Sequence, residues 1–186
     1  MSSRMVCLPP PEPDHSALFN EFTAAINPLG LPMSCCEHKP APQAPLAEKF
    51  QDLLGNVEAP QLYQLVGQIF RNEKFSALLF YHADQNPNGS FSAFELFTFS
   101  STGLRLDRLV LAESSVLDNG PEATLIASES VQRSAKIEKN LTIQLQETRK
   151  VKPGEMASDP AERITQLNQT YQVDAETGKI TLLKSP

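Results

Sequence analysis

The side chains best suited to hold an ion lie between residues 84 and 95. The segment DQNPNG at 84–89, followed by Glu95, matches the calcium-binding loop of an EF-hand at each of its defining positions. In such a loop, oxygens from Asp84, Asn86, Asn88 and Glu95 surround the ion, while Gly89 permits the sharp bend. A calcium site built from these four residues is therefore one hypothesis for this segment.

The residues around the motif favour a different structure. An EF-hand needs a helix leaving from Glu95, whereas residues 97–103 are aromatic, Thr, Ser and Gly, which favour strand and turn. Pro87 also lies inside the loop, and no second matching loop exists for pairing. We therefore predict that the turn at 86–89 joins two strands in a plain hairpin, with no bound metal or cofactor.

A second group of potential ligands lies at Cys35, Cys36, Glu37 and His38. A structural zinc site needs two separated pairs of ligands, so this single cluster predicts a solvated loop instead. The three cysteines are an odd number and two are adjacent, which predicts reduced thiols. The chain has no G-x-S-x-G, no phosphate-cradling loop and no H-E-x-x-H. We predict no catalytic residues and no enzymatic activity.

The strands flanking the motif are the most apolar part of the chain. Residues 75–82 predict one strand, and residues 91–99 predict a second with both faces covered, because apolar side chains occupy both of its alternating sets. A third strand is predicted at 104–111. Its leucines change phase, which indicates a bulge near Asp107 and Arg108, a pair predicted to be solvated.

The N-terminal third predicts helices. Residues 1–12 are Pro-rich and predict a flexible N-terminus. Apolar residues at helical spacing predict a helix over 15–26 and a shorter one over 46–54, with an irregular connection at 29–45. Residues 61–70 fit a helix or a strand, and we favour the strand.

The C-terminal third predicts more strands, at 124–131 and 141–146, followed by a polar loop at 150–162 and a final hairpin over 170–183. The combined prediction is an α+β fold, in which two short N-terminal helices pack against an antiparallel meander of about seven or eight strands. Residues 13–186 then form one domain, with a helical preface at 13–58 and the antiparallel sheet at 59–186.

Composition excludes some partners. The chain has 186 residues and a net charge of −6, whereas a general nucleic-acid binder needs a basic surface. No apolar run approaches the roughly 20 residues that span a bilayer, and the first thirty residues have no apolar core typical of a signal peptide. These features predict a cytoplasmic protein that binds neither nucleic acid nor membrane.

The order of features resembles that of β-rich bacterial proteins, some of them immunity-like partners of secreted toxins. The resemblance rests on the segments LLFYHAD, FELFTFSSTGLRLDRLVLAES, NLTIQL and YQVDAETGKI. It implies a non-enzymatic protein that binds another protein, for example an inhibitor of a basic toxin. The alternatives are the calcium-binding module described above and a small-ligand carrier with a pocket lined by Phe.

Overall fold

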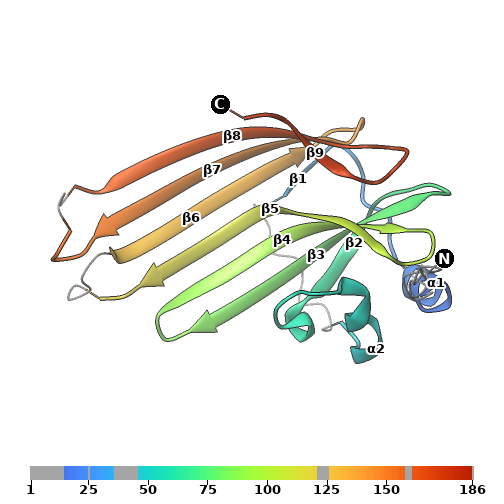
Figure 1. The fold of residues 1–186 in the computed structure, drawn as a ribbon, viewed down its shortest axis with the longest axis horizontal. Helices are drawn as coiled ribbons and strands as arrows, with labels where there is room; N and C mark the ends of the chain where they lie inside the picture. The colour runs from blue at the N-terminus through green and yellow to red at the C-terminus, as the bar shows by residue number, and fades with distance from the viewer. Residues whose placement is uncertain (1–14, 25, 36–45, 121–125, 158–160, 186) are drawn as a thin grey trace, which may run out of the picture.

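The computed structural model describes residues 15–24, 26–35, 46–120, 126–157 and 161–185. Its main feature is a 9-stranded antiparallel sheet in the order β2-β3-β4-β5-β6-β7-β8-β9, with β1 paired to β6 (Figure 1). The strands are β1 Met33–Cys35, β2 Gln64–Arg71, β3 Phe75–Asn86, β4 Gly89–Ser100, β5 Arg105–Asp118, β6 Ile126–Ile137, β7 Thr142–Pro153, β8 Arg163–Val173 and β9 Ile180–Lys184. The predicted α+β fold with an antiparallel meander is confirmed.

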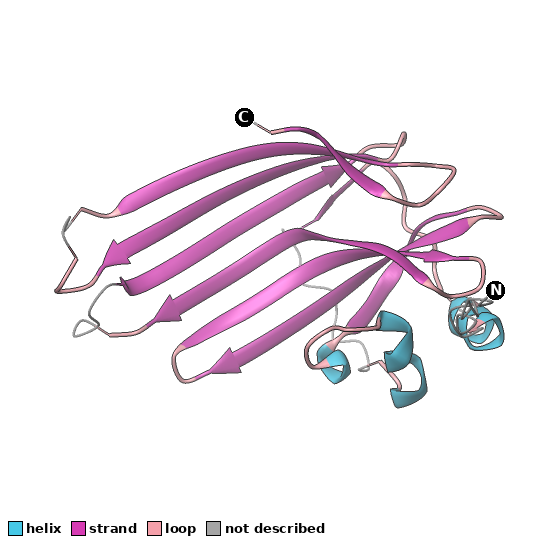
Figure 2. Ribbon diagram, in the orientation of Figure 1, coloured by secondary structure: helices cyan, strands magenta, loops and turns pink. Residues whose placement is uncertain are grey.

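Short helices lie beside one half of this sheet (Figure 2). They are α1 Ser16–Thr23, α2 Glu48–Gln51, η1 Asp52–Leu54 and η2 Pro60–Leu62. The two predicted helices correspond to α1 and to α2 with η1, the second ending at Gly55, whose φ of +63° suits glycine. Residues 61–70 form mainly β2, as favoured from the sequence.

The aromatic side chains of β3 and β4 form a core under these helices. Phe97 and Phe99 lie on the same side of β4 as predicted, and they pack with Phe19 and Phe22 of α1. The ring centroids of Phe19 and Phe99 are 5.3 Å apart. These contacts bury the apolar face of α1, which has no side-chain cap at its N-terminus.

A second core lies against the other face of β3 and β4. It combines side chains of β2 to β5, such as Leu79 and Leu96, with side chains of β1, β6, β7 and β8, such as Ile137 and Ile143. The sheet curls to bring these parts together, and the turn before β9 lies against the start of β5 (Figure 1). Lys179 Nζ donates to the Leu106 carbonyl at 2.6 Å, and the Ile180 amide donates to Asp107 Oδ2 at 2.9 Å.

Bulges in β5 explain the change of leucine phase. The β4–β5 register shifts at Leu106 and at Leu111, so the predicted bulge lies immediately before Asp107 and a second one follows. As a result, Leu106, Leu109 and Leu111 all pack in the same core.

Several predicted boundaries were wrong. The connection 29–45 contains β1, which raises the strand count to nine and places a strand inside the predicted helical preface. The predicted loop 150–162 begins four residues too early, because β7 continues to Pro153. The strand predicted at 124–131 extends to Ile137, and the one predicted at 104–111 extends to Asp118. The final hairpin begins at Arg163, seven residues before the predicted start at 170. The predicted flexible segment 1–12 lies outside the described residues, as do residues 36–45 of the predicted connection.

No helix among the described residues is long and apolar enough to cross a membrane.

Candidate functional site

Glu95 is a charged side chain inside the helix-covered core, with 1% of its surface exposed. It lies in β4, opposite Phe80 of β3 on one side and Val110 of β5 on the other. Its Oε1 accepts a hydrogen bond from the Tyr63 hydroxyl at 3.1 Å and lies 2.6 Å from His82 Nε2.

Arg108 supplies the remaining partners of this carboxylate. Its Nη2 donates to Glu95 Oε1 at 2.9 Å, and its Nε donates to Oε2. The His82 ring stacks on Tyr63 with centroids 4.3 Å apart. We call these residues, Tyr63, His82, Glu95 and Arg108, the buried polar cluster.

Burial and hydrogen bonding shift the pKa values of Tyr63, Glu95 and Arg108. Burial alone would raise the pKa of Glu95, but hydrogen bonds from His82 and Arg108 outweigh it and lower that pKa from the ordinary 4.5. Burial, followed by the charge of Glu95, raises the pKa of Tyr63 well above its ordinary 10.0. The hydrogen bond that Arg108 donates to Glu95 raises the pKa of Arg108. At neutral pH the cluster is therefore an ionised carboxylate held by a guanidinium and a protonated phenol.

This arrangement connects elements and leaves little room for chemistry. Both oxygens of Glu95 are engaged, so the carboxylate has no free edge to offer a substrate proton or a cation. Its partners come from β3, β5 and the residue after η2. The cluster thus ties the helical layer to the sheet, and we assign it a structural role.

The structure does not bring the four potential calcium ligands together. Asp84, Asn86 and Asn88 lie in or next to the β3–β4 turn, where Asn86 pairs with Gly89, while Glu95 lies farther along β4 in the core. Asp84 Oδ1 instead accepts from the Gln85 amide at 2.8 Å, and Asn86 Oδ1 accepts from the Asn88 amide at 3.0 Å. The predicted plain hairpin is the structure that this segment adopts.

The cysteine cluster is only partly described. Cys35 lies buried in β1, whereas Cys36, Glu37 and His38 fall outside the described residues. Within the part of the chain that is described, no three His, Cys, Asp or Glu side chains are placed to hold a metal ion.

Arg108 was misassigned from the sequence. It was predicted to form a solvated pair with Asp107, but its guanidinium points to Glu95, and Asp107 accepts from the Arg108 and Ile180 amides. A signal for a buried acid was available, because Glu95 shares its side of the strand with Phe97 and Phe99. A carboxylate on an apolar face requires a buried partner.

The accessible candidate site is the far half of the sheet, away from the helices. Side chains on both faces are exposed or half-exposed throughout residues 113–118 of β5, 128–134 of β6, 146–153 of β7 and 163–169 of β8. The strands there run toward the left of Figure 1, where none of the described helices covers them. A large part of this sheet is therefore surface on both sides.

The two faces differ in chemistry. One carries ion pairs: Arg133 Nε donates to Glu147 Oε2 at 2.8 Å and its Nη1 lies 3.6 Å from Glu113, while Arg149 pairs with Glu129 at 2.8 Å. We call this the charged face. The other face is made mainly of hydroxyl and amide side chains, and we call it the hydroxyl-amide face. Its members include Ser114, Ser130, Gln132, Ser134, Gln146, Thr148, Gln166 and Asn168.

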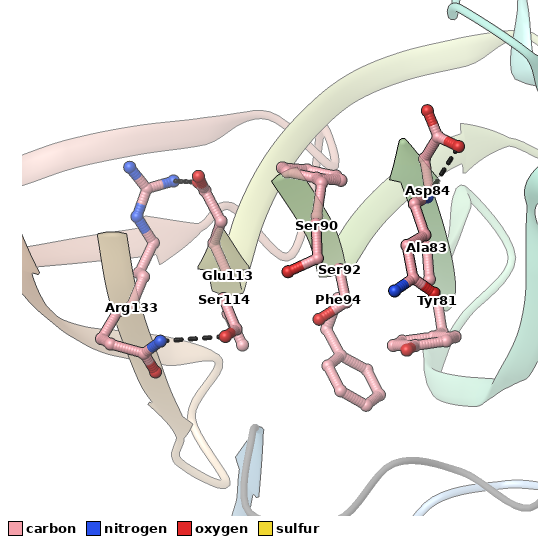
Figure 3. A pocket seen from close by; sticks show the side chains of 13 residues that line it. Tyr81, Ala83, Asp84, Ser90, Ser92, Phe94, Glu113, Ser114 and Arg133 are labelled. Atoms are coloured by element: carbon pink, nitrogen blue, oxygen red, sulfur yellow. Dashed lines mark hydrogen bonds and ion pairs between the residues drawn. The ribbon is translucent and has the colours of Figure 1, made fainter. Parts of the chain in front are cut away.

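A hollow of about 680 Å³ lies across β3 to β6. Figure 3 shows the rings of Tyr81 and Phe94 on the same side of the strands as Ser114, whereas Arg133 and Glu113 point to the other side. Gln132 Nε2 donates to Ser114 Oγ at 2.9 Å beside it. The hollow thus combines a mostly buried aromatic floor with neutral polar groups.

Comparison with models of protein families, with curated proteins and with solved structures finds no match.

Proposed function

We propose that this chain is a non-enzymatic protein that binds another protein through the far half of its sheet. The observation that carries the proposal is the exposure of both faces of the far half of β5 to β8, a large surface that lies beyond the residues of either core. The buried polar cluster supports a non-enzymatic role, because its carboxylate is fully engaged and does not line the hollow.

The charged face is the better candidate for the binding surface. It combines arginines with the exposed Leu117 and the half-exposed Val131 and Leu167, a mixture of Arg and apolar groups that is typical of protein interfaces. The hydroxyl-amide face also carries the exposed Val116 and Ile164, but its other groups are mainly hydroxyls and amides, and its described residues in the far half include no arginine.

A more specific version is that the partner is a basic toxin and the chain is an immunity-like inhibitor. The net charge of −6 supports a basic partner, because opposite net charges accelerate association. The carboxylates of the charged face are themselves paired with Arg133 and Arg149, so the attraction would be long-range and would not come from free acids at the contact.

The test is binding between this chain and the protein encoded by the neighbouring gene, measured by surface plasmon resonance. We expect saturable binding whose association rate falls as salt rises from about 50 to 500 mM, since salt screens exposed charges. The absence of binding would contradict the proposed function, and a salt-independent association rate would contradict the basic partner.

A matched pair of variants tests which face binds. Leu117 and Val116 are neighbours in β5 with exposures of 44% and 45%, and they point to opposite faces. Leu117→Lys should weaken binding roughly tenfold, about 1.4 kcal/mol, while Val116→Lys should leave it nearly unchanged. Equal effects of the two substitutions would contradict use of the charged face.

The hollow supports a second candidate function, that of a small-ligand carrier. Phe94 supplies an aromatic ring to its lining, on the same face as Tyr81 and 5.0 Å from it between ring centroids. A neutral polar ligand would fit the hydroxyl and amide groups of Ser92, Ser114 and Gln132. Ligand-induced shifts of the backbone amide signals of Ser92, Ser114 and Gln132 in nuclear magnetic resonance spectra would support the carrier. Shifts confined to other parts of the chain would contradict it.

A further inference from the structure

The outer border of β8 is an exposed strand edge. β8 pairs with β7 along Arg163 to Gln172, but it pairs with β9 only from Thr170 to Val173. Within the part of the chain that the structure describes, residues 164–169 therefore have a strand on one side only, at the upper border of the sheet in Figure 1. In such an edge, alternate residues direct their amide and carbonyl groups outward.

The opposite edge of the sheet is treated differently. β2 is covered by the preceding chain, because the Leu29 amide donates to the Gln68 carbonyl at 2.7 Å and the Gln68 amide donates to the Asn27 carbonyl at 3.1 Å. No such segment covers residues 164–169 in the described chain. Among the described residues, the preceding chain thus covers the β2 edge at Gln68, whereas residues 164–169 of β8 remain able to pair.

The edge also lacks the residues that commonly prevent pairing. Residues 164–169 read ITQLNQ, with no Pro and no charge, and Ile164 is 58% exposed. Proteins usually protect an edge with lysine, proline or a bulge, and an uncharged regular edge is a template for another strand. The regular β7–β8 register shows no bulge in this stretch.

We propose that two copies of this chain associate by antiparallel pairing of their β8 edges around a two-fold axis at Gln166. Pairing cannot extend past Gln169, because Lys184 of β9 already lies opposite Thr170. A two-fold axis perpendicular to the sheet places the same face of both copies on the same side. Residues that lie opposite each other across the dimer must therefore belong to the same face, so their numbers differ by an even number. The axis at Gln166 gives the longest overlap under both conditions.

The resulting side-chain pairs are compatible. Ile164 lies opposite Asn168 of the second copy, Thr165 lies opposite Leu167, and Gln166 lies opposite itself. No like charges meet inside this ladder, and the exposed Ile164 and the half-exposed Leu167 each gain a cross-strand neighbour. Two sheets would join into one continuous sheet in which the charged faces of both copies point the same way.

The association should be weak. A single edge-to-edge ladder buries well under the roughly 1,200 Å² typical of stable interfaces, so we expect a reversible dimer visible only at micromolar or higher concentration. This inference goes beyond the proposed function and needs no second kind of protein.

The test is sedimentation velocity across a concentration series with variants at the axis. Gln166→Lys and Gln166→Glu each place two like charges opposite each other and should raise the dimer dissociation constant at least roughly tenfold. An equimolar mixture of the two variants places Lys against Glu and should restore dimerisation. Ser130→Lys, on the same face but in β6, should dimerise like the parent protein.

Cross-linking tests the register independently. Gln166→Cys should form a disulfide-linked dimer under mild oxidation, with the 166–166 linkage identified by mass spectrometry, whereas Leu167→Cys should cross-link far less. A parent protein that stays monomeric at a few hundred micromolar would overturn the proposal. So would axis variants that dimerise like the parent, a charge mixture that fails to restore dimers, or preferred linkage at residue 167.

Discussion

At the scale of single residues, Glu95 shows how the core tolerates a charge. A carboxylate moved out of water loses several kcal/mol of hydration unless hydrogen bonds replace it. Here Tyr63, His82 and Arg108 supply that replacement, and Arg108 remains 37% exposed, so the pair keeps some contact with solvent. The cluster thus gives the core a fixed arrangement of β3, β4 and β5.

Glu95→Gln should destabilise the fold by about 3 kcal/mol at pH 7, because it leaves Arg108 and His82 without their anion. The pKa of Glu95 is lowered in the folded state, so its stabilisation is present above the ordinary pKa of 4.5 and is lost as pH falls through the folded value. Urea denaturation from pH 7 to 3 should therefore show the two proteins converging at low pH. As a control, Glu113→Gln should lower the free energy of unfolding much less, because the Glu113 side chain is 17% exposed.

A difference in unfolding free energy between the parent protein and Glu95→Gln that grows as pH falls would contradict this account.

Calcium should give no saturable heat in titration calorimetry up to millimolar concentration. Glu95 is held by Arg108 and cannot join Asp84, Asn86 and Asn88 around one ion without breaking the buried polar cluster. Asp84→Asn should titrate like the parent protein. A saturable signal lost in both Asp84→Asn and Glu95→Gln would restore the calcium hypothesis.

Part of this site was predictable from sequence. Alternation along residues 91–99 already places Glu95 on an apolar face, which predicts burial. Its partners were not predictable, because Tyr63 lies 32 residues away in sequence and Arg108 lies 13 away, and only the strand registers bring them together. The bulges at Leu106 and Leu111 determine which way Arg108 points, and sequence indicates them only approximately.

At the scale of elements, the β3–β4 hairpin depends on glycine for a packing reason. A Cβ at Gly89 would lie 2.1 Å from the Val116 carbonyl oxygen of β5, a distance that backbone cannot absorb without moving. Gly89→Ala should therefore cost about 2 kcal/mol, measured by chemical denaturation, because the strands must separate locally. Gly30→Ala, where nothing lies within 4 Å, should be nearly neutral. Equal costs would show that packing at β5 is unimportant.

The elements missed from sequence share a physical cause. Hydrophobic alternation marks a strand only where one face is buried. The C-terminal part of β7 and the start of β8 are exposed or half-exposed on both faces. Residues 150–153 therefore looked like loop. β1 is three residues long and is defined by pairing with β6, so its own sequence carries little signal. The strands with a buried face, such as β3 and β4, were placed well.

At the scale of the whole molecule, the curled sheet is closed by its last hairpin. Ile180 packs against the second core, whereas Leu183 of the same strand is 60% exposed. Ile180→Ala should lower the free energy of unfolding by about 2 kcal/mol, and Leu183→Ala should change it by less than about 0.5 kcal/mol. Thermal denaturation followed by circular dichroism measures both. A larger loss at Leu183 would mean that the closing contact is made by the other face of β9.

The closing contact also matters for how the protein is made. Asn72 donates a hydrogen bond to the Ala175 carbonyl at 2.9 Å, and β1 pairs with β6. Early parts of the chain therefore need partners that are synthesised much later. Until then, the apolar face of β3 and β4 that belongs to the second core has no cover from β6 to β9. Nascent chains would be exposed to premature association for much of translation, and a chaperone that shields those two strands would raise the yield of folded protein.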